Sequence, residues 1–343
     1  MNKIFKVMIP AITGAIVFTG CSSGTATDSN DNNTTSVSVT DSGDDKDGKL
    51  KIVTSIFPEY DWVNNILGEK AEDAEITLLC DSGTDMHSFE PSAEDFLKIS
   101  DCDVFVYGGG VSEEWIGDAL ANARNKDMVT VSLMEILGEN AKTEEIIEGM
   151  QEEIEEDHTD EHDDAEYDEH VWLSLKNAGL ITEGIADALC EADSENSDIY
   201  RKNASDYKSR LEDLDTRYKK ATDEATVKTL LFADRFPFRY LTDDYGLTYY
   251  AAFPGCSADT EASFDTVIFL AKKADELGLK HIMTIEGSDH SIADTVRSNT
   301  TGKDQDILEL NSMQSVTKDD IANGLSYTDI MESNLKVLEK ALN

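Results

Sequence analysis

The sequence predicts an α/β protein of two lobes, each a mostly parallel sheet flanked by helices, joined by one long linking helix. Two observations lead to this class. Short runs rich in β-branched and aromatic residues alternate with segments of helical period, which is typical of βαβ units and parallel sheets. Midway along the chain, residues 194–223 contain neither proline nor glycine and repeat apolar residues at close to helical spacing. A helix of about 30 residues runs on the order of 45 Å, which is longer than one lobe needs.

The expected strands form two groups, one on each side of this helix. They are 51–56, 75–79, 104–107 and 128–132 in the first group, and 229–233, 248–253, 281–285 and 307–310 in the second. Amphipathic stretches such as EYDWVNNILGEK and ASFDTVIFLAKKADELG lie between them and indicate helices. We therefore expect an N-terminal lobe at 49–193, a linking helix at 194–223 and a C-terminal lobe at 224–343. Folds of this kind bind ligands in a cleft at the carboxyl ends of the strands.

Residues 1–21 have the pattern of a secretory signal peptide. Lys3 and Lys6 make its start basic, an apolar stretch follows, and small residues precede Cys21. This ending resembles the lipobox of bacterial lipoproteins, in which the cysteine is lipidated and becomes the first mature residue. A plain signal peptide cut nearby is the alternative. Residues 22–48 are mostly Ser, Thr, Asp, Asn and Gly, so we expect a flexible tether.

The charge of the chain excludes one class of partner. It has 71 acidic and 29 basic side chains, which gives a net charge of −42. A nucleic acid would be repelled, and cationic partners are favoured. No apolar run after the signal reaches the roughly 20 residues of a membrane-spanning helix. We therefore expect an extracytoplasmic monomer that meets the bacterial cell membrane only through its lipid anchor.

Five cysteines are present: Cys21, Cys80, Cys102, Cys190 and Cys256. Lipidation of the first would leave four, which allow up to two disulfides in an exported protein and equally allow free buried thiols. The sequence does not determine the pairing. Because no two of them have the C-x-x-C spacing, we do not expect a cysteine zinc site.

Two of the six histidines lie where ligands are expected. His87, in CDSGTDMHSFEPSAEDF, follows a predicted strand and precedes a helix, which places it in a strand-end loop. His170, in DEHVWLSLKNAG, lies on the approach to a helix. Taken singly, each is equally compatible with an ordinary histidine satisfied by local hydrogen bonds.

A very acidic stretch, 139–169, contains His158 and His162. It is too charged to pack, so we expect a loop. Imidazole and carboxylate together suit Zn2+, which favours a weak, auxiliary collector of divalent cations. Solvated low-complexity sequence is the alternative.

Together these segments resemble the zinc/manganese substrate-binding lipoproteins of ABC importers. The resemblance covers about 51–343 and is carried by KIVTSIFPEYDWVNNILGEKAED, GTDMHSFEPSAEDFLKISDCDVFVYGGGVSEEWI, the acidic histidine loop, DEHVWLSLKNA and YTDIMESNLKVLEKALN. It implies two lobes, a rigid linking helix and one buried divalent metal in the cleft. It also implies delivery of that metal to an importer's permease and ATPase. The histidine loop is typical of zinc-selective members, so Zn2+ is the expected cargo and Mn2+ the alternative.

The resemblance implies ligands position by position. His87 and His170 match the first two. The third position, usually histidine or glutamate, falls on Arg235 when aligned from the downstream YGL and on Asp234 when aligned from the upstream strand. A guanidinium stays protonated and cannot bind a cation, whereas a carboxylate can. We therefore expect Asp234, with a charge-partner role for it as the alternative.

The fourth position, often aspartate in the family, falls on Asn311, whose amide oxygen is a poor zinc ligand. Glu286 follows a strand of the C-terminal lobe and is the expected substitute; capping the next helix is its alternative role. His290 has a weaker claim and His281 is expected to be structural. Two imidazoles with one or two carboxylates favour Zn2+ over Mg2+ or Ca2+, whereas Mn2+ prefers more oxygen.

Two other classes of function compete with metal transport. A zinc hydrolase would use Glu286 or Asp234 as a base beside metal-bound water. The sequence has no H-E-x-x-H, G-x-S-x-G or P-loop string, so we do not expect an enzyme. A metal-dependent surface adhesin is the alternative from the interaction class.

Overall fold

The computed structural model describes residues 48–151, 166–257 and 261–343. The predicted signal peptide with Cys21, nearly all of the predicted tether, and His158 and His162 lie outside the described residues. The described ranges belong to one compact unit, Gly48–Asn343.

The N-terminal lobe is built on a parallel sheet with strand order β2-β1-β3-β4. Its strands are β1 (Leu50–Thr54), β2 (Ala74–Leu78), β3 (Val104–Tyr107) and β4 (Val129–Ser132). Its α-helices are α1 (Phe57–Leu67), α2 (Ala93–Asp101), α3 (Trp115–Ala121), α4 (Leu133–Leu137) and α5 (Leu175–Ala192). Short 3-10 helices are η1 (Gly68–Asp73), η2 (Met86–Ser88), η3 (Val111–Glu113), η4 (Gly138–Asn140) and η5 (Val171–Leu173). The buried VFV of β3 explains its place inside the sheet.

The C-terminal lobe repeats this plan in the parallel order β6-β5-β7-β8. Its strands are β5 (Thr229–Phe236), β6 (Thr248–Pro254), β7 (His281–Ile285) and β8 (Asp306–Leu310). Its helices are α7 (Arg239–Tyr245), α8 (Phe264–Leu277), α9 (Ser291–Asn299), α10 (Lys318–Ala322) and α11 (Tyr327–Ala341). β5 runs three residues past its predicted end at 233, and its register with β6 shifts between Phe232 and Arg235.

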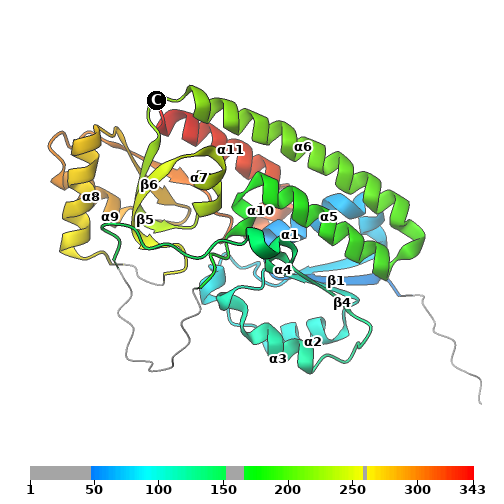
Figure 1. Ribbon diagram of the computed structural model, residues 1–343. Helices are drawn as coiled ribbons and strands as arrows, with labels where there is room; N and C mark the ends of the chain where they lie inside the picture. Colours follow the sequence, from blue (N-terminus) through cyan, green and yellow to red (C-terminus); the bar gives the residue numbers. More distant parts are fainter. Residues whose placement is uncertain (1–47, 152–165, 258–260) are drawn as a thin grey trace, which may run out of the picture. The chain divides into compact units, whose positions relative to one another are not determined.

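A helix of 28 residues, α6 (Ser197–Glu224), connects the lobes after the 3-10 turn η6 (Ser194–Asn196). Figure 1 shows it in green along both halves of the unit. Its apolar face is buried, and two tyrosines on that face reach different lobes. Tyr207 Oη donates to Asp61 Oδ2 of α1 at 3.1 Å, and Tyr218 Oη donates to the Met331 carbonyl of α11 at 2.6 Å. The predicted fold class, two α/β lobes with one long helix, is confirmed.

The two lobes share one continuous hydrophobic core. Trp62 of α1 packs edge-on against Tyr327 of α11, with ring centroids 5.2 Å apart. Tyr327 Oη donates to the Trp172 carbonyl at 2.7 Å, and Trp172 Nε1 donates to the Ser312 carbonyl at 2.9 Å. Because close-packed interiors resist deformation, this core fixes the loops that face one another between the lobes.

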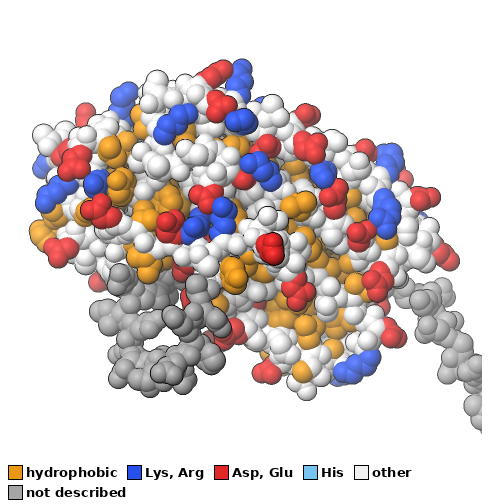
Figure 2. All heavy atoms as spheres, in the orientation of Figure 1, with side chains coloured by type: hydrophobic (Ala, Val, Ile, Leu, Met, Phe, Trp, Pro, Cys, Tyr) orange, Lys and Arg blue, Asp and Glu red, His pale blue; other side chains and the backbone are white. Residues whose placement is uncertain are grey.

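Three further findings bear on function. No helix in the described ranges is long and apolar enough to cross a membrane. The four cysteines of the unit are free thiols: Cys80, Cys102, Cys190 and Cys256. Of the two alternatives left open by the sequence, disulfides or free thiols, the structure has free thiols. On the face drawn in Figure 2, acidic and basic side chains are scattered together.

Candidate metal centre

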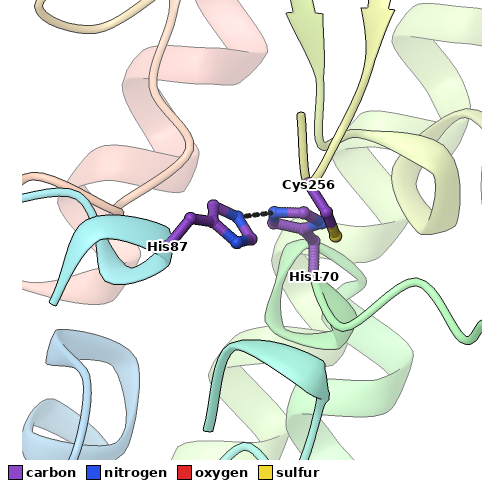
Figure 3. A group of neighbouring side chains, drawn as sticks. All are labelled: His87, His170 and Cys256. Atoms are coloured by element: carbon purple, nitrogen blue, oxygen red, sulfur yellow. Dashed lines mark hydrogen bonds between the residues drawn. The ribbon is translucent and has the colours of Figure 1, made fainter. Parts of the chain in front are cut away.

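Three loops, each following a strand or preceding a helix, bring His87, His170 and Cys256 together (Figure 3). His87 lies in η2, in the loop after β2, and Asp85 caps this turn by accepting from the His87 backbone N–H at 3.0 Å. His170 directly precedes η5 and is fully buried. Cys256 comes two residues after β6.

The three side chains have the spacing of ligands around one ion. The Nε2 atoms of His87 and His170 are 3.1 Å apart, and all three ligand atoms lie within 4.8 Å of one another. Two nitrogens at about 2.0–2.1 Å from a tetrahedral zinc would be about 3.3 Å apart. The imidazole pair is therefore nearly at the separation that zinc requires.

Neighbouring side chains orient both imidazoles with Nε2 toward the other ring. The Nδ1–H of His170 donates to Asp168 Oδ1 at 2.9 Å. Ser112 Oγ donates to Glu169 Oε1 at 2.5 Å, so it accepts from the Nδ1–H of His87 at 2.6 Å. With both Nδ1 atoms protonated, two Nε2 lone pairs face each other, and either a proton or a metal ion must lie between them. A carboxylate behind a ligating histidine is the usual support of a metal site.

The electrostatics of the pair are asymmetric. Burial lowers the pKa of His87, and the neighbouring His170 lowers it further. Burial acts against protonation of His170 as well, but the Asp168 carboxylate outweighs it and raises the pKa of that ring. A proton shared by the pair therefore resides on His170.

The thiol is also held by acidic neighbours. Cys256 Sγ donates to Glu169 Oε1 at 3.5 Å, and the Cys256 backbone N–H donates to Glu144 Oε1 at 3.2 Å. Burial, followed by the charges of these two glutamates, raises the pKa of Cys256 above its ordinary range. The thiol is therefore protonated unless a cation replaces the proton.

Gly255 explains how the cysteine loop comes so close to His170. A Cβ added there would lie 3.0 Å from His170 Cε1 and 3.0 Å from the Phe236 carbonyl oxygen. The loop therefore needs glycine beside the cysteine.

The two predicted carboxylate ligands lie outside this cluster. Asp234 accepts from the backbone N–H groups of Arg235 at 2.9 Å and Ile285 at 3.3 Å. Glu286 accepts from the backbone N–H and hydroxyl of Ser312 and from the Gln314 backbone N–H, at 2.6–2.9 Å. Both carboxylates therefore accept hydrogen bonds from backbone N–H groups of the C-terminal lobe.

The remaining candidate positions lie apart from the cluster. Arg235 forms an ion pair with Asp85. Asn311 exchanges hydrogen bonds with Asn334, at 2.9 and 2.8 Å. His281 begins β7, and His290 precedes α9 in a left-handed conformation with φ of 62°. None of these residues joins the cluster within the described chain.

A cavity of about 560 Å3 opens beside His87, between the lobes. Its charged lining residues are Asp85, Asp234, Arg235, Glu286 and Asp289. Four carboxylates against one guanidinium make this approach attractive to a cation.

Comparison with known proteins identifies the family. The family described as zinc-uptake complex component A, periplasmic (ZnuA), matches residues 52–341. The chain belongs to the ZnuA family. It is 32% identical over 298 residues to the zinc-binding lipoprotein AdcA of Streptococcus pneumoniae, covering 86% of this chain and 56% of AdcA. The chain thus spans little more than half the length of the AdcA proteins it matches.

Two further relatives match along most of their length. The high-affinity zinc uptake system protein ZnuA of Bacillus subtilis is 30% identical over 302 residues, covering 88% of this chain and 90% of that protein. The Zn(II)-bound ZnuA-like domain of S. pneumoniae AdcA is 29% identical, with a TM-score of 0.67, covering 86% of this chain and 99% of that domain. These relatives are named for zinc binding and uptake, which agrees with the expectation that the chain is not an enzyme. The ZnuA family is periplasmic, so an extracytoplasmic location is also supported.

Cys256 is the member of this cluster that the sequence did not indicate. The expectation of no cysteine zinc site was based on the missing C-x-x-C spacing, whereas the fold brings this cysteine beside two histidines distant in the chain. The available signal was its position in the loop directly after a strand. The same kind of position indicated His87.

Proposed function

We propose that this protein captures a divalent metal, Zn2+, between its lobes and delivers it to an ABC importer. The observation that carries the proposal is the imidazole pair, whose Nε2 atoms lie 3.1 Å apart with both Nδ1 atoms engaged elsewhere. Such a pair holds a cation by geometry that is already in place. The names of the full-length relatives support zinc as the cargo.

We propose His87, His170 and Cys256 as the ligands. Two imidazoles and a thiolate suit zinc, whereas Mn2+, the alternative cargo, prefers oxygen. Asp234 and Glu286 remain predicted ligands that the same titration tests. Their present hydrogen bonds to backbone N–H groups favour the cysteine as the third ligand.

The setting of the protein belongs to the same proposal. Lipidation at Cys21 would anchor a monomer to the outer face of the bacterial cell membrane through the 22–48 tether. The partners would be the permease and ATPase of an importer. His158 and His162 would add weak auxiliary sites, and deletion of 152–165 should abolish those while leaving the tight site intact.

The test is a competition titration of the purified chain without its signal peptide. We expect about one tightly bound Zn2+ per chain, as a single cluster of this kind predicts. The double substitution His87→Ala with His170→Ala should abolish tight binding, and Cys256→Ser should weaken it. Cys190→Ser is the matched control, because that thiol is buried between α5 and α6, where its Sγ donates to the Ser197 carbonyl.

The outcomes separate the ligand sets. Asp234→Asn and Glu286→Gln should leave the affinity close to that of the parent protein. A tight site that survives loss of both histidines would refute the proposal. A loss of affinity in Asp234→Asn or Glu286→Gln, with Cys256→Ser unaffected, would restore the carboxylates as ligands.

A further inference from the structure

The guanidinium of Arg235 lies between the loops that carry His87 and Cys256. Arg235 follows the irregular register of β5, and its side chain is 16% exposed. Its Nη2 pairs with Asp85, two residues before His87. Its Nη1 donates to the carbonyl of Ser257, directly after Cys256, at 3.4 Å. One side chain thus contacts both ligand-bearing loops.

Asp85 links Arg235 to the His87 turn. Its Oδ1 accepts from the His87 backbone N–H at 3.0 Å, while its Oδ2 pairs with Arg235. A guanidinium is a planar donor fork that fixes the direction of a bound carboxylate, unlike the point charge of an ammonium. Arg235 therefore fixes the direction of the Asp85 carboxylate, which in turn caps the His87 turn.

The contact also crosses from one lobe to the other. The His87 loop follows β2 of the N-terminal lobe, whereas Arg235 and Cys256 belong to the C-terminal lobe. Ser82 forms an isolated bridge with Thr317, and Asp81 pairs with Lys318 at 2.8 Å, so the loop is attached to the C-terminal lobe at a second place. Arg235 is the attachment that also contacts the loop carrying Cys256, through the Ser257 carbonyl.

We infer that Arg235 is a positioning residue of the metal site. It holds the His87 turn and the Cys256 loop close together before the metal ion binds. The inference rests on the proposed function. A permanent cation beside a cation site would oppose binding by itself, but the Asp85 carboxylate neutralises it. The ion pair therefore supplies rigidity without adding net positive charge.

Four variants test this inference by Zn2+ titration. Arg235→Met removes both contacts, whereas Asp85→Asn removes the ion pair and keeps an oxygen to cap the His87 turn. Each should weaken Zn2+ binding about 10–100-fold, the usual effect of losing a residue behind a ligand. The double variant should bind no more weakly than Arg235→Met, because one interaction is lost in both. Arg235→Lys should recover part of the affinity. Arg217→Met is the control, since it removes an exposed pair with Glu332 at 2.9 Å.

Two readouts distinguish positioning from general damage. In Co2+-loaded protein, the sulfur-to-cobalt charge-transfer band should weaken or shift in Arg235→Met and remain unchanged in Arg217→Met. In the metal-free protein, hydrogen exchange of the 80–90 peptide should accelerate in Arg235→Met, with peptides of α6 unchanged. Unaltered Zn2+ affinity, band and exchange in Arg235→Met would overturn the inference and leave the proposed function intact. Failure of the parent protein to bind zinc would overturn the proposed function instead.

Discussion

His87 and His170 direct their Nε2 atoms at each other across 3.1 Å, from loops 83 residues apart in the chain. Ser112 Oγ and Asp168 Oδ1 accept hydrogen bonds from the two Nδ1–H groups, which leaves both Nε2 atoms available. Two neutral rings in this arrangement repel each other, because their Nε2 lone pairs face one another. A cation between the two atoms turns this repulsion into attraction. The proposed site therefore depends on Ser112 and Asp168 as much as on the two histidines.

Asp168→Asn should weaken Zn2+ binding by about 10–100-fold. The amide keeps an oxygen for the His170 backbone N–H, which donates to Asp168 Oδ1 at 2.9 Å, but it lacks the negative charge that makes His170 a stronger ligand. Competition titration measures the change. Asp95→Asn, at the exposed cap of α2, is the control and should bind as the parent does. Equal affinity of the two variants would show that the Asp168 charge does not support the ligand.

Cys256→Asp should lower the preference for Zn2+ over Mn2+. A carboxylate oxygen suits manganese better than a thiolate does, so the ratio of the two affinities should fall by at least about tenfold. Parallel titrations with both metals measure the ratio. A ratio unchanged from that of the parent protein would show that the thiol does not contact the ion.

Gly255→Ala should weaken metal binding while leaving the fold in place. The added Cβ would press on His170 Cε1 and on the Phe236 carbonyl oxygen, each 3.0 Å away, and the backbone oxygen cannot easily move. We expect the cysteine loop to shift outward and the affinity to fall about tenfold, within the range seen for supporting residues. Gly117→Ala, where a Cβ meets nothing within 4 Å, is the matched control. If both variants bound Zn2+ with similar affinity, the claim that Gly255 is needed for the close approach of the cysteine loop to His170 would be wrong.

Asp61→Asn should stabilise the protein above pH 6. Burial raises the pKa of Asp61 from 3.8 to about 6, although Tyr207 donates to it. A carboxyl whose folded pKa is raised favours folding at low pH, and this contribution is lost as pH rises from about 4 to about 6. The amide has no such loss, so the gain at pH 7.5 should be at most about 3 kcal/mol.

Urea unfolding of the metal-free protein at pH 4 and pH 7.5 measures this difference. The gain should be much smaller at pH 4, because Asp61 is then protonated in the folded protein. Asp73→Asn removes an exposed pair with Lys70 and should change stability by less than about 0.5 kcal/mol at either pH. If the Asp61→Asn variant were no more stable than the parent protein at pH 7.5, the claim that burial of the Asp61 charge destabilises the fold would be wrong.

The sequence was informative where local pattern governs structure. Alternating strands and helices predicted the two sheets, and a stretch without proline or glycine predicted α6. His87 could be proposed because a ligand after a buried strand has a local signature. His170 could be proposed because the family resemblance located it, and the structure places both imidazoles in one cluster.

Cys256 could not be found in the same way, because nothing in its spacing connects it to a histidine 86 or more residues away. Only the pairing of β6 beside β5, together with the small Gly255, brings it to His170. Asp234 was predicted from its place near a strand end. In the structure its carboxylate accepts from the backbone N–H of Ile285 at 3.3 Å, a long-range contact that the sequence does not indicate.

The proposed site holds its ion with two imidazoles and one thiolate. X-ray absorption at the zinc edge of the loaded protein tests this ligand set most directly, because sulfur and nitrogen neighbours differ in distance. We predict one sulfur at about 2.3 Å together with imidazole nitrogens at about 2.0–2.1 Å, and loss of the sulfur shell in Cys256→Ser. A shell made of nitrogen and oxygen alone in the parent protein would contradict the thiolate ligand.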